Sequence, residues 1–308
     1  MPVDHEFGSV STDLKLSMVE GYLSAFTRAL RPKFGQLWYI DAFAGTGNRT
    51  IRHAAQPAGM WTEAVEARVE RRRGSAEIAL HVSPAFDRLI FIEKKKSHYE
   101  ALLHLKAAHP HRKIDVARGD ANELVLAALK GQSWAGVRAV MFLDPYGMHL
   151  DWTTLEAIRQ TKAIDIWYLV SLSGLYRQAP RDRGKLSEQK RSAITRTFGT
   201  SRWEQEWYPQ SKLGDLFADL DDDLTPAERL EGPRRVADVS QIEAFALKRL
   251  RDLFPAVLPP LRLHNDSGSP MFSLFFATSN DDPKAIGLAS KIAGHILASG
   301  RASHVRKR

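Results

Sequence analysis

Short apolar runs alternate along the chain with longer stretches in which apolar residues recur at helical spacing. The runs are rich in branched and aromatic side chains, as buried parallel strands are. Strands separated by amphipathic helices are typical of βαβ units. We therefore predict an α/β fold with a doubly wound sheet and an antiparallel closing strand. The predicted strands are residues 38–40, 88–93, 113–117, 139–143 and 164–170, with a closing pair at 258–264 and 271–278.

Helical periodicity and spacing predict the helices and two insertions. About fifty residues separate the first two strands, whereas a plain βαβ unit needs about thirty. We predict that residues 48–52 open a helix, that 62–73 form a charged surface helix or loop, and that 75–81 are the crossover helix. Insertions at 52–74 and at 177–240, the second of them helical, then interrupt a single domain spanning 1–308. The other predicted helices are residues 12–30, 97–108, 124–130, 187–198, 241–254 and 283–298.

The first strand ends in an acidic residue followed by a small-residue turn, Asp41-Ala42-Phe43-Ala44-Gly45-Thr46-Gly47. Gly45 and Gly47 permit positive φ and close approach of a ligand to the backbone. A strand, a glycine turn and a helix N-terminus form a Rossmann-like nucleotide-binding crevice. The dinucleotide fingerprint requires Gly or Ala where this chain has Thr50, whereas a carboxylate at Asp41 can accept from the ammonium group of S-adenosylmethionine (SAM). An ordinary βα turn with Asp41 as a helix cap is the structural alternative.

Acidic residues also end later predicted strands, at the same edge of a doubly wound sheet. Glu93 can accept from ribose hydroxyls, and Asp120 can accept from an adenine amine. Lys15 lies in the first turn of a predicted helix, where the helix dipole disfavours a cation. A ligand contact explains this placement, and a solvated lysine is the alternative. The predicted cofactor-binding residues are Lys15, Asp41, Phe43, Ala44, Gly45, Gly47, Glu93, Lys94, Asp120, Ala121 and Asp144.

The composition excludes several chemistries. The chain has no cysteine, which rules out thiolate zinc sites, iron–sulfur clusters, disulfides and base methylation through a cysteine nucleophile. His104, His109 and His111 cluster in a polar stretch typical of a solvated face, so we expect no metal site. No apolar stretch is long enough to span a membrane, and residues 1–13 lack the apolar segment of a signal peptide. We expect a cytoplasmic protein.

The formal net charge of +8 fits a polyanionic partner, and we expect nucleic acid, DNA or RNA. Because the predicted crevice is acidic, the positive charge that holds nucleic acid must lie outside it. We predict that it lies in the two insertions, at Arg68, Arg71, Arg72, Arg73, Arg177, Arg181, Arg183 and Lys185. The alternative is that these residues pair with Glu66, Glu70 and Asp182 on a solvated surface.

The fourth strand ends on Asp144-Pro145-Tyr146-Gly147. This run is similar to the motif of methyltransferases that modify exocyclic amines of bases, and it looks even more like the Asp-Pro-Phe/Tyr-Gly motif of tRNA guanine-N2 methyltransferases. An aryl amine is a poor nucleophile because its lone pair is delocalised into the ring. Asp144 and the carbonyl of Pro145 can accept its two N–H bonds, and Tyr146 can stack on a flipped or single-stranded base. The base-amine motif has a second proline that this chain lacks, which shifts Tyr146 by one position.

The chain as a whole resembles the three-Cys-motif partner protein family, which has a class I SAM-dependent methyltransferase-like fold. The resemblance rests on the helix with Lys15, Asp41-Ala42-Phe43-Ala44-Gly45, Gly74-Ser75 before a helix, Phe91-Ile92-Glu93, Asp144-Pro145-Tyr146-Gly147, Phe198-Gly199 followed by Trp203, and residues 271–277. It implies SAM binding and pairing with a separate protein that bears three cysteines. It does not specify a methyl acceptor.

Two hypotheses of function follow. In the first, the protein is a SAM-dependent methyltransferase that acts on a base amine of nucleic acid, with Asp144, Pro145 and Tyr146 as catalytic residues. In the second, it is a SAM-binding partner subunit that is inactive alone, and Asp144 is structural. A methyltransferase of small molecules or proteins and a nicotinamide enzyme are the remaining alternatives. An intact Asp144-Pro145 pair favours catalysis.

Overall fold

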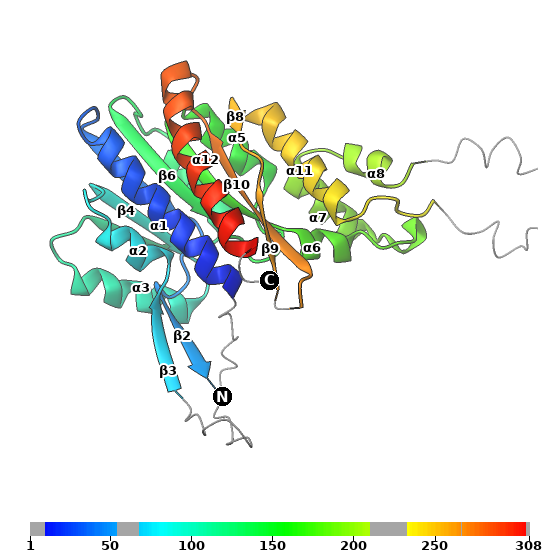
Figure 1. The fold of residues 1–308 in the computed structure, drawn as a ribbon, viewed down its shortest axis with the longest axis horizontal. Coiled ribbons are helices and arrows are strands. Elements are labelled where there is room, and N and C mark those ends of the chain that lie inside the picture. Colours follow the sequence, from blue (N-terminus) through cyan, green and yellow to red (C-terminus); the bar gives the residue numbers. More distant parts are fainter. Residues whose placement is uncertain (1–9, 54–67, 210–232, 266, 306–308) are drawn as a thin grey trace, which may run out of the picture.

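A mixed sheet with β1 near its centre organises the fold (Figure 1). The computed structural model describes residues 10–53, 68–209, 233–265 and 267–305. Within them the sheet order is β5-β4-β1-β6-β7-β10-β8, with β9 also paired to β10. The strands are β1 (Gln36–Asp41), β4 (Arg88–Glu93), β5 (Ile114–Arg118), β6 (Val137–Leu143), β7 (Ile164–Ser171), β8 (Ala256–Val257), β9 (Leu261–His264) and β10 (Pro270–Thr278).

The strands from β1 to β7 in this sheet pair in parallel, and β10 runs antiparallel to β7, β8 and β9. This is the doubly wound α/β sheet with an antiparallel closing strand that the sequence predicts. Parallel pairing requires crossover connections, which the helices supply. The helices are α1 (Val10–Leu30), α2 (Ser75–His81), α3 (Lys96–Ala108), α4 (Ala121–Leu129), α5 (Trp152–Gln160), α6 (Leu172–Gln178), α7 (Glu188–Phe198), α8 (Arg202–Trp207), α11 (Val239–Leu253) and α12 (Pro283–Val305), with a short 3-10 turn η1 (Arg183–Lys185).

Side chains of successive strand residues point to opposite faces of the sheet. Because both sets are apolar here, helices cover both faces. In β1, Leu37 and Tyr39 pack in one apolar cluster with α1, α2 and α12. Trp38 and Ile40 pack in a second cluster with α4, α5, α7 and α11. Figure 1 shows α1 and α12 side by side across one face. Two buried faces explain why the strand sequences are continuously apolar.

The segment after the glycine turn differs from the sequence prediction. Residues 48–52 were predicted to open a helix, but they form β2 (Asn48–His53), which pairs antiparallel with β3 (Arg68–Arg73). This hairpin projects from the body of the molecule (Figure 1). The backbone N–H of Gly74 donates to the carbonyl of Gly47 at 2.7 Å, so the chain enters and leaves the hairpin at one point. The helix predicted to open at 48–52 is therefore absent, whereas the crossover helix predicted for 75–81 is confirmed as α2.

The first insertion thus begins at residue 48 rather than 52, and its described part is strand rather than the helix or loop predicted for 62–73. The part at 62–67 lies outside the described residues, as does the acidic run 219–223 of the second insertion. Residues 177–209 and 233–240 of that insertion contain α7, α8 and the start of α11, so its described part is largely helical as predicted. Among the described helices, none combines the length and apolarity that a membrane span needs.

Candidate active site at the carboxyl edge of the sheet

The strand order creates a topological switch point between β1 and β6. From β1 the chain first builds β4 and β5 on one side, and it then returns through α4 to build β6 and β7 on the other side. Ligands of open α/β sheets bind outside the carboxyl ends of the strands at such a point. Asp41 ends β1, Glu93 ends β4, and Asp144 follows β6 directly. The structure therefore brings these three predicted residues to one edge of the sheet.

The glycine turn between β1 and the hairpin has the backbone conformation that its sequence predicts. Gly45 has φ of 61° and Gly47 has φ of 78°, a region that side chains disfavour. The N–H of Gly45 donates to Oε2 of Glu93 at 3.0 Å, and the N–H of Ala44 donates to the carbonyl of Ile92 at 3.0 Å. A Cβ added at Gly45 would meet no atom within 4 Å. The turn is thus tied to the end of β4 and keeps open space beside Gly45.

Asp41 stabilises this turn through hydrogen bonds of its side chain. Its side chain is fully buried, and its oxygens accept from the N–H of Phe43 at 3.2 Å and from the Tyr39 hydroxyl at 3.2 Å. Ser75, the first residue of α2, adds a further hydrogen bond. Burial raises the pKa of Asp41 to about 6, and these hydrogen bonds oppose the shift only in part. Asp41 therefore joins the turn to α2, and its contact with a ligand stays a prediction.

The other two predicted nucleotide carboxylates are only partly exposed and already carry hydrogen bonds. Oε1 of Glu93 accepts from the N–H of Lys95 at 2.7 Å. Asp120 caps α4 by accepting from the N–H of Asn122 at 3.0 Å, and it pairs with Lys94 at 3.2 Å. Although partial burial raises the pKa of Asp120, the hydrogen bonds from Lys94 and Asn122 outweigh that effect and hold the pKa below its usual value. The edge near β4 and β5 is therefore preorganised.

Asp144 forms an ion pair with Lys15, which α1 places above the end of β6. Lys15 is only 8% exposed and lies 5.7 Å from the centre of the Phe142 ring. The ion pair involves Oδ2 of Asp144. Among the described residues, no hydrogen bond reaches Oδ1 of Asp144, and the side chain is 28% exposed. Lys15 was predicted to contact a ligand, and its observed partner in the fold is this carboxylate.

The residues after Asp144 differ sharply in exposure. Pro145 is buried, whereas Tyr146 is 68% exposed. Gly147 has φ of 65°, in the left-handed region that favours glycine. No described backbone or side-chain group donates to the carbonyl of Pro145. The loop after β6 therefore has one carboxylate oxygen and one carbonyl without a donor among the described residues, and one exposed aromatic ring.

The predicted nucleic-acid-binding residues fall into three groups. Arg72 pairs with Asp13, Arg73 pairs with Glu20 at 2.9 Å, and Arg183 pairs with Glu204 at 3.0 Å. These acidic partners differ from the ones that the sequence suggested. The side chains of Arg68 and Arg71 lie outside the described part of the structure. The exposed residues that form no ion pair with another described residue are Arg177, Arg181 and Lys185.

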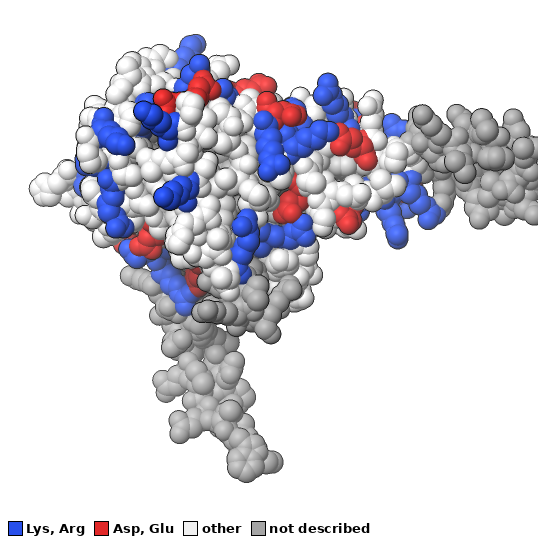
Figure 2. Space-filling model, turned by 45° about the horizontal axis from the view of Figure 1, so that its top comes forward, with Lys and Arg blue, Asp and Glu red and all other residues white. Residues whose placement is uncertain are grey.

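Basic and acidic side chains lie close together over much of the face shown in Figure 2. The basic side chains on this face are therefore scattered and form no single uninterrupted band. His104, His109 and His111 are exposed or partly exposed, as the solvated-face interpretation predicts. Within the described ranges, no group of three or more His, Asp or Glu side chains is placed to hold a metal ion.

Two contributors to the site were not predicted from the sequence. Tyr39 and Ser75 complete the hydrogen bonding of Asp41. Ser75 had a local signal, because a serine after Gly74 marks a helix start. Tyr39 had none, since an aromatic residue inside an apolar strand is typical of core. The pairing of Lys15 with Asp144 joins residues far apart in the chain, so no local pattern indicates it.

Comparisons with known proteins give likenesses in fold only. No family model and no curated protein matches this sequence. Protein LPL1258 from Legionella pneumophila is 14% identical, over 92% of this chain and 90% of its own, with a TM-score of 0.48. The N-terminal domain of EvdMO1 with SAH bound is 11% identical over 84% and 80%, with a TM-score of 0.37. YcgJ from Bacillus subtilis is 13% identical over 83% and 95%, with a TM-score of 0.31. At such scores they identify no activity, and the resemblance to the three-Cys-motif partner family stays a prediction.

Proposed function

We propose that this protein is a SAM-dependent methyltransferase whose acceptor is an exocyclic amine of a base in nucleic acid. The observation that carries the proposal is the placement of the Gly45–Gly47 turn and Asp144 at neighbouring strand ends of the switch point. The glycine turn suits binding of a nucleotide, and the carboxylate of Asp144 suits binding of an amine. Their adjacency fits a transfer reaction between the two.

The residues at this edge fit SAM in charge and in shape. The open space beside Gly45 allows a ligand to approach the turn closely. Asp120, with its side chain 37% exposed, and Glu93 lie at the ends of β5 and β4, where the adenosine part would lie. When bound, SAM supplies an electrophilic methyl group on a positively charged sulfur, and the carboxylates at this edge favour that charge.

The acceptor amine would be held by the loop after β6. Lys15 occupies Oδ2 of Asp144 and fixes the orientation of the carboxylate, which leaves Oδ1 to accept one N–H of the amine. The carbonyl of Pro145 accepts the second N–H. With both N–H bonds held, the nitrogen lone pair is directed away from the ring and toward the methyl donor. The exposed ring of Tyr146 offers a stacking surface for the base.

A second function is favoured by one specific observation. Because Asp144 is already neutralised by Lys15, the same contact would be expected if Asp144 only anchored α1 to the sheet. The protein would then be a SAM-binding subunit that is inactive without a partner. The partner would be a separate protein bearing three cysteines, as the family resemblance implies.

Transfer of a radiolabelled methyl group from SAM distinguishes the two functions. The parent protein is incubated with pools of DNA, RNA and protein, with and without a three-cysteine partner. Asp144→Asn is compared with Asp151→Asn, which alters an ion pair to Arg196 just before α5, outside the site. We expect labelled nucleic acid with the parent protein. Asp144→Asn alone should lose roughly a hundredfold in turnover, because a neutral amide replaces the charged carboxylate that accepts from the reacting amine.

Three results would decide against the leading proposal. Labelling that appears only with the partner assigns the protein to the second function. Labelling of protein alone removes nucleic acid as the acceptor. Turnover of Asp144→Asn equal to that of Asp151→Asn excludes a role of Asp144 in the reaction. Circular dichroism and calorimetric titration with SAM check that both variants fold and keep SAM affinity.

A further inference from the structure

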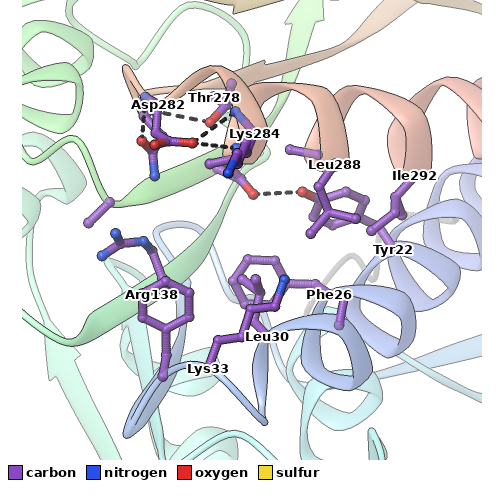
Figure 3. Close-up of a pocket in the computed structure, with 17 residues that line it drawn as sticks. Tyr22, Phe26, Leu30, Lys33, Arg138, Thr278, Asp282, Lys284, Leu288 and Ile292 are labelled. Atoms are coloured by element: carbon purple, nitrogen blue, oxygen red, sulfur yellow. Dashed lines mark hydrogen bonds between the residues drawn. The ribbon is translucent and has the colours of Figure 1, made fainter.

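A cavity lies at the edge of the sheet opposite the glycine turn. Its walls come from α1, α12, the starts of β6 and β7, and the end of β10 (Figure 3). Its volume is about 300 Å³, at the lower end of the range for small-molecule pockets. Nothing in the proposed methyl transfer uses it.

The walls formed by the two helices are apolar. Phe26 and Leu30 of α1 face Leu288 and Ile292 of α12, and small alanines between them leave the space open. Such a surface favours an apolar body, at about 25 cal/mol for each Å² removed from water.

Arg138, at the start of β6, supplies a cation to the same cavity. Its guanidinium is partly buried, lies 4.3 Å from the centre of the Phe34 ring, and donates to the carbonyl of Val137 at 2.7 Å. Among the described residues it forms no ion pair, although a guanidinium has five N–H donors. An anion with a planar pair of oxygens, such as a carboxylate, could accept from the remaining N–H groups of this guanidinium.

The remaining charges of the cavity reinforce this preference. Lys33 and Lys284 also line it, and neither forms an ion pair within the described part of the chain. Asp165 is engaged by the Tyr22 hydroxyl at 2.7 Å and by Thr278, and burial raises its pKa. Asp282 caps α12 by accepting from the N–H groups of Lys284 and Ala285 at 2.8 and 3.0 Å. Both acids also act electrostatically on Arg138, but the cavity is lined by three cations, Lys33, Arg138 and Lys284, against these two acids.

We propose that this cavity binds a small organic anion with an apolar body. The anionic group lies at Arg138, between Lys33 and Lys284, and the apolar body lies between α1 and α12. The site is independent of SAM and of the methyl acceptor.

Calorimetric titration of the full chain with three eight-carbon probes tests this inference. The probes are octanoate, octanol and octylamine, which share an apolar body and differ in charge. We expect saturable one-to-one binding of octanoate and at least roughly tenfold weaker binding of the other two, since a hydrogen bond to a charged group contributes about 1.5–3 kcal/mol. Arg138→Gln should weaken octanoate binding by a similar factor.

Arg88→Gln is the matched control, because Arg88 also starts a strand at this edge and lies on an aromatic ring, that of Trp38, but outside the cavity. It should bind octanoate like the parent. Ala285→Leu places extra carbon atoms in the cavity and should abolish binding of octanoate. Octanol binding equal to octanoate, equal weakening by Arg138→Gln and Arg88→Gln, or no saturable binding at millimolar octanoate would each overturn the proposal. Thermal unfolding confirms that each variant is folded.

Discussion

Asp41 and Asp144 lie at the ends of the neighbouring strands β1 and β6, but their carboxylates have different environments. Asp144 has Lys15 as a counter-ion and keeps partial contact with solvent. Asp41 is fully buried, forms no ion pair with a described residue, and lies within the electrostatic influence of Asp144. Hydrogen bonds from Tyr39, Phe43 and Ser75 offset only part of the cost of burying its charge. Asp41 is therefore a carboxylate whose ionisation opposes folding near neutral pH.

The substitution Asp41→Asn tests this cost through the pH dependence of stability. The folded-state pKa of about 6 lies above the unfolded value of 3.8. The folded state therefore binds this proton more tightly, and the contribution of Asp41 to the free energy of unfolding falls as pH rises from about 4 to about 6. Asn does not titrate, so its stability relative to the parent should grow by about 3 kcal/mol across that window.

Urea unfolding between pH 4 and pH 7.5 measures this difference. Glu100→Gln, at an exposed carboxylate of α3, is the control and should follow the parent curve. Parallel curves for Asp41→Asn and the parent would contradict a raised pKa at this position.

At the scale of elements, ion pairs join α1 to the β2–β3 hairpin and to the candidate site. Arg72 and Arg73 of β3 pair with Asp13 and Glu20 of α1, and Lys15 of the same helix pairs with Asp144. The hairpin itself is joined to the body where Gly47 and Gly74 meet. A Cβ on Gly74 would lie 2.6 Å from the carbonyl oxygen of Gly47, which is backbone and has little freedom to move. The glycine turn, the hairpin and the start of α2 therefore depend on one close contact.

Gly74→Ala should destabilise the protein and disturb the turn together. The added methyl group forces the backbone at Gly47 to shift, which we expect to cost about 1–3 kcal/mol, as overpacking does. SAM affinity, measured by calorimetry, should fall as well, because Gly47 belongs to the turn.

Gly35→Ala is the matched control, since a Cβ there meets no atom within 4 Å and should leave both quantities nearly unchanged. Unfolding in urea compares the two variants. Equal stability of Gly74→Ala and Gly35→Ala would show that the contact with Gly47 does not constrain the turn.

For the whole molecule, the question is where the excess of eight positive charges can meet a polyanion. Arg72, Arg73 and Arg183 are committed to acidic partners within the fold. Arg177, Arg181 and Lys185 follow β7 in the chain, in and after α6, and are exposed. They are the predicted basic residues that are exposed and form no ion pair with another described residue, so binding of phosphates by them stays a prediction.

Reversing these three residues to Glu should weaken nucleic-acid binding and its dependence on salt. Each phosphate that the protein no longer neutralises flattens the logarithmic salt slope by about 0.7–0.9, so three should flatten it by roughly two to three units. Fluorescence anisotropy with a single-stranded oligonucleotide at several salt concentrations measures the slope.

Reversing the exposed residues Lys106, Lys113 and Lys130 to Glu gives a control with the same change in net charge at the opposite edge. Its slope should stay close to that of the parent. If both triple variants change the slope equally, the contribution is one of net charge and not of a site after β7.

The amino-acid sequence alone predicted the α/β alternation, the doubly wound sheet with its antiparallel closing strand, and the residues that end each strand. These features follow from local periodicity and from the conformational freedom of Gly45 and Gly47, which neighbours in the chain specify. It did not determine that residues 48–53 are a strand, because an inserted hairpin and a first helical turn are both polar there. The two-residue strand β8 was also too short to leave a periodic pattern.

The packing of distant segments sets which charges are compensated and where a cavity forms. Lys15 meets Asp144 across 129 positions of sequence, and Asp41 acquires its raised pKa from the elements that bury it. The cavity near Arg138 likewise exists only because α1 and α12, from opposite ends of the chain, pack beside each other. Burial and ion pairing depend on how distant segments meet in space, and no local pattern of residues encodes that meeting.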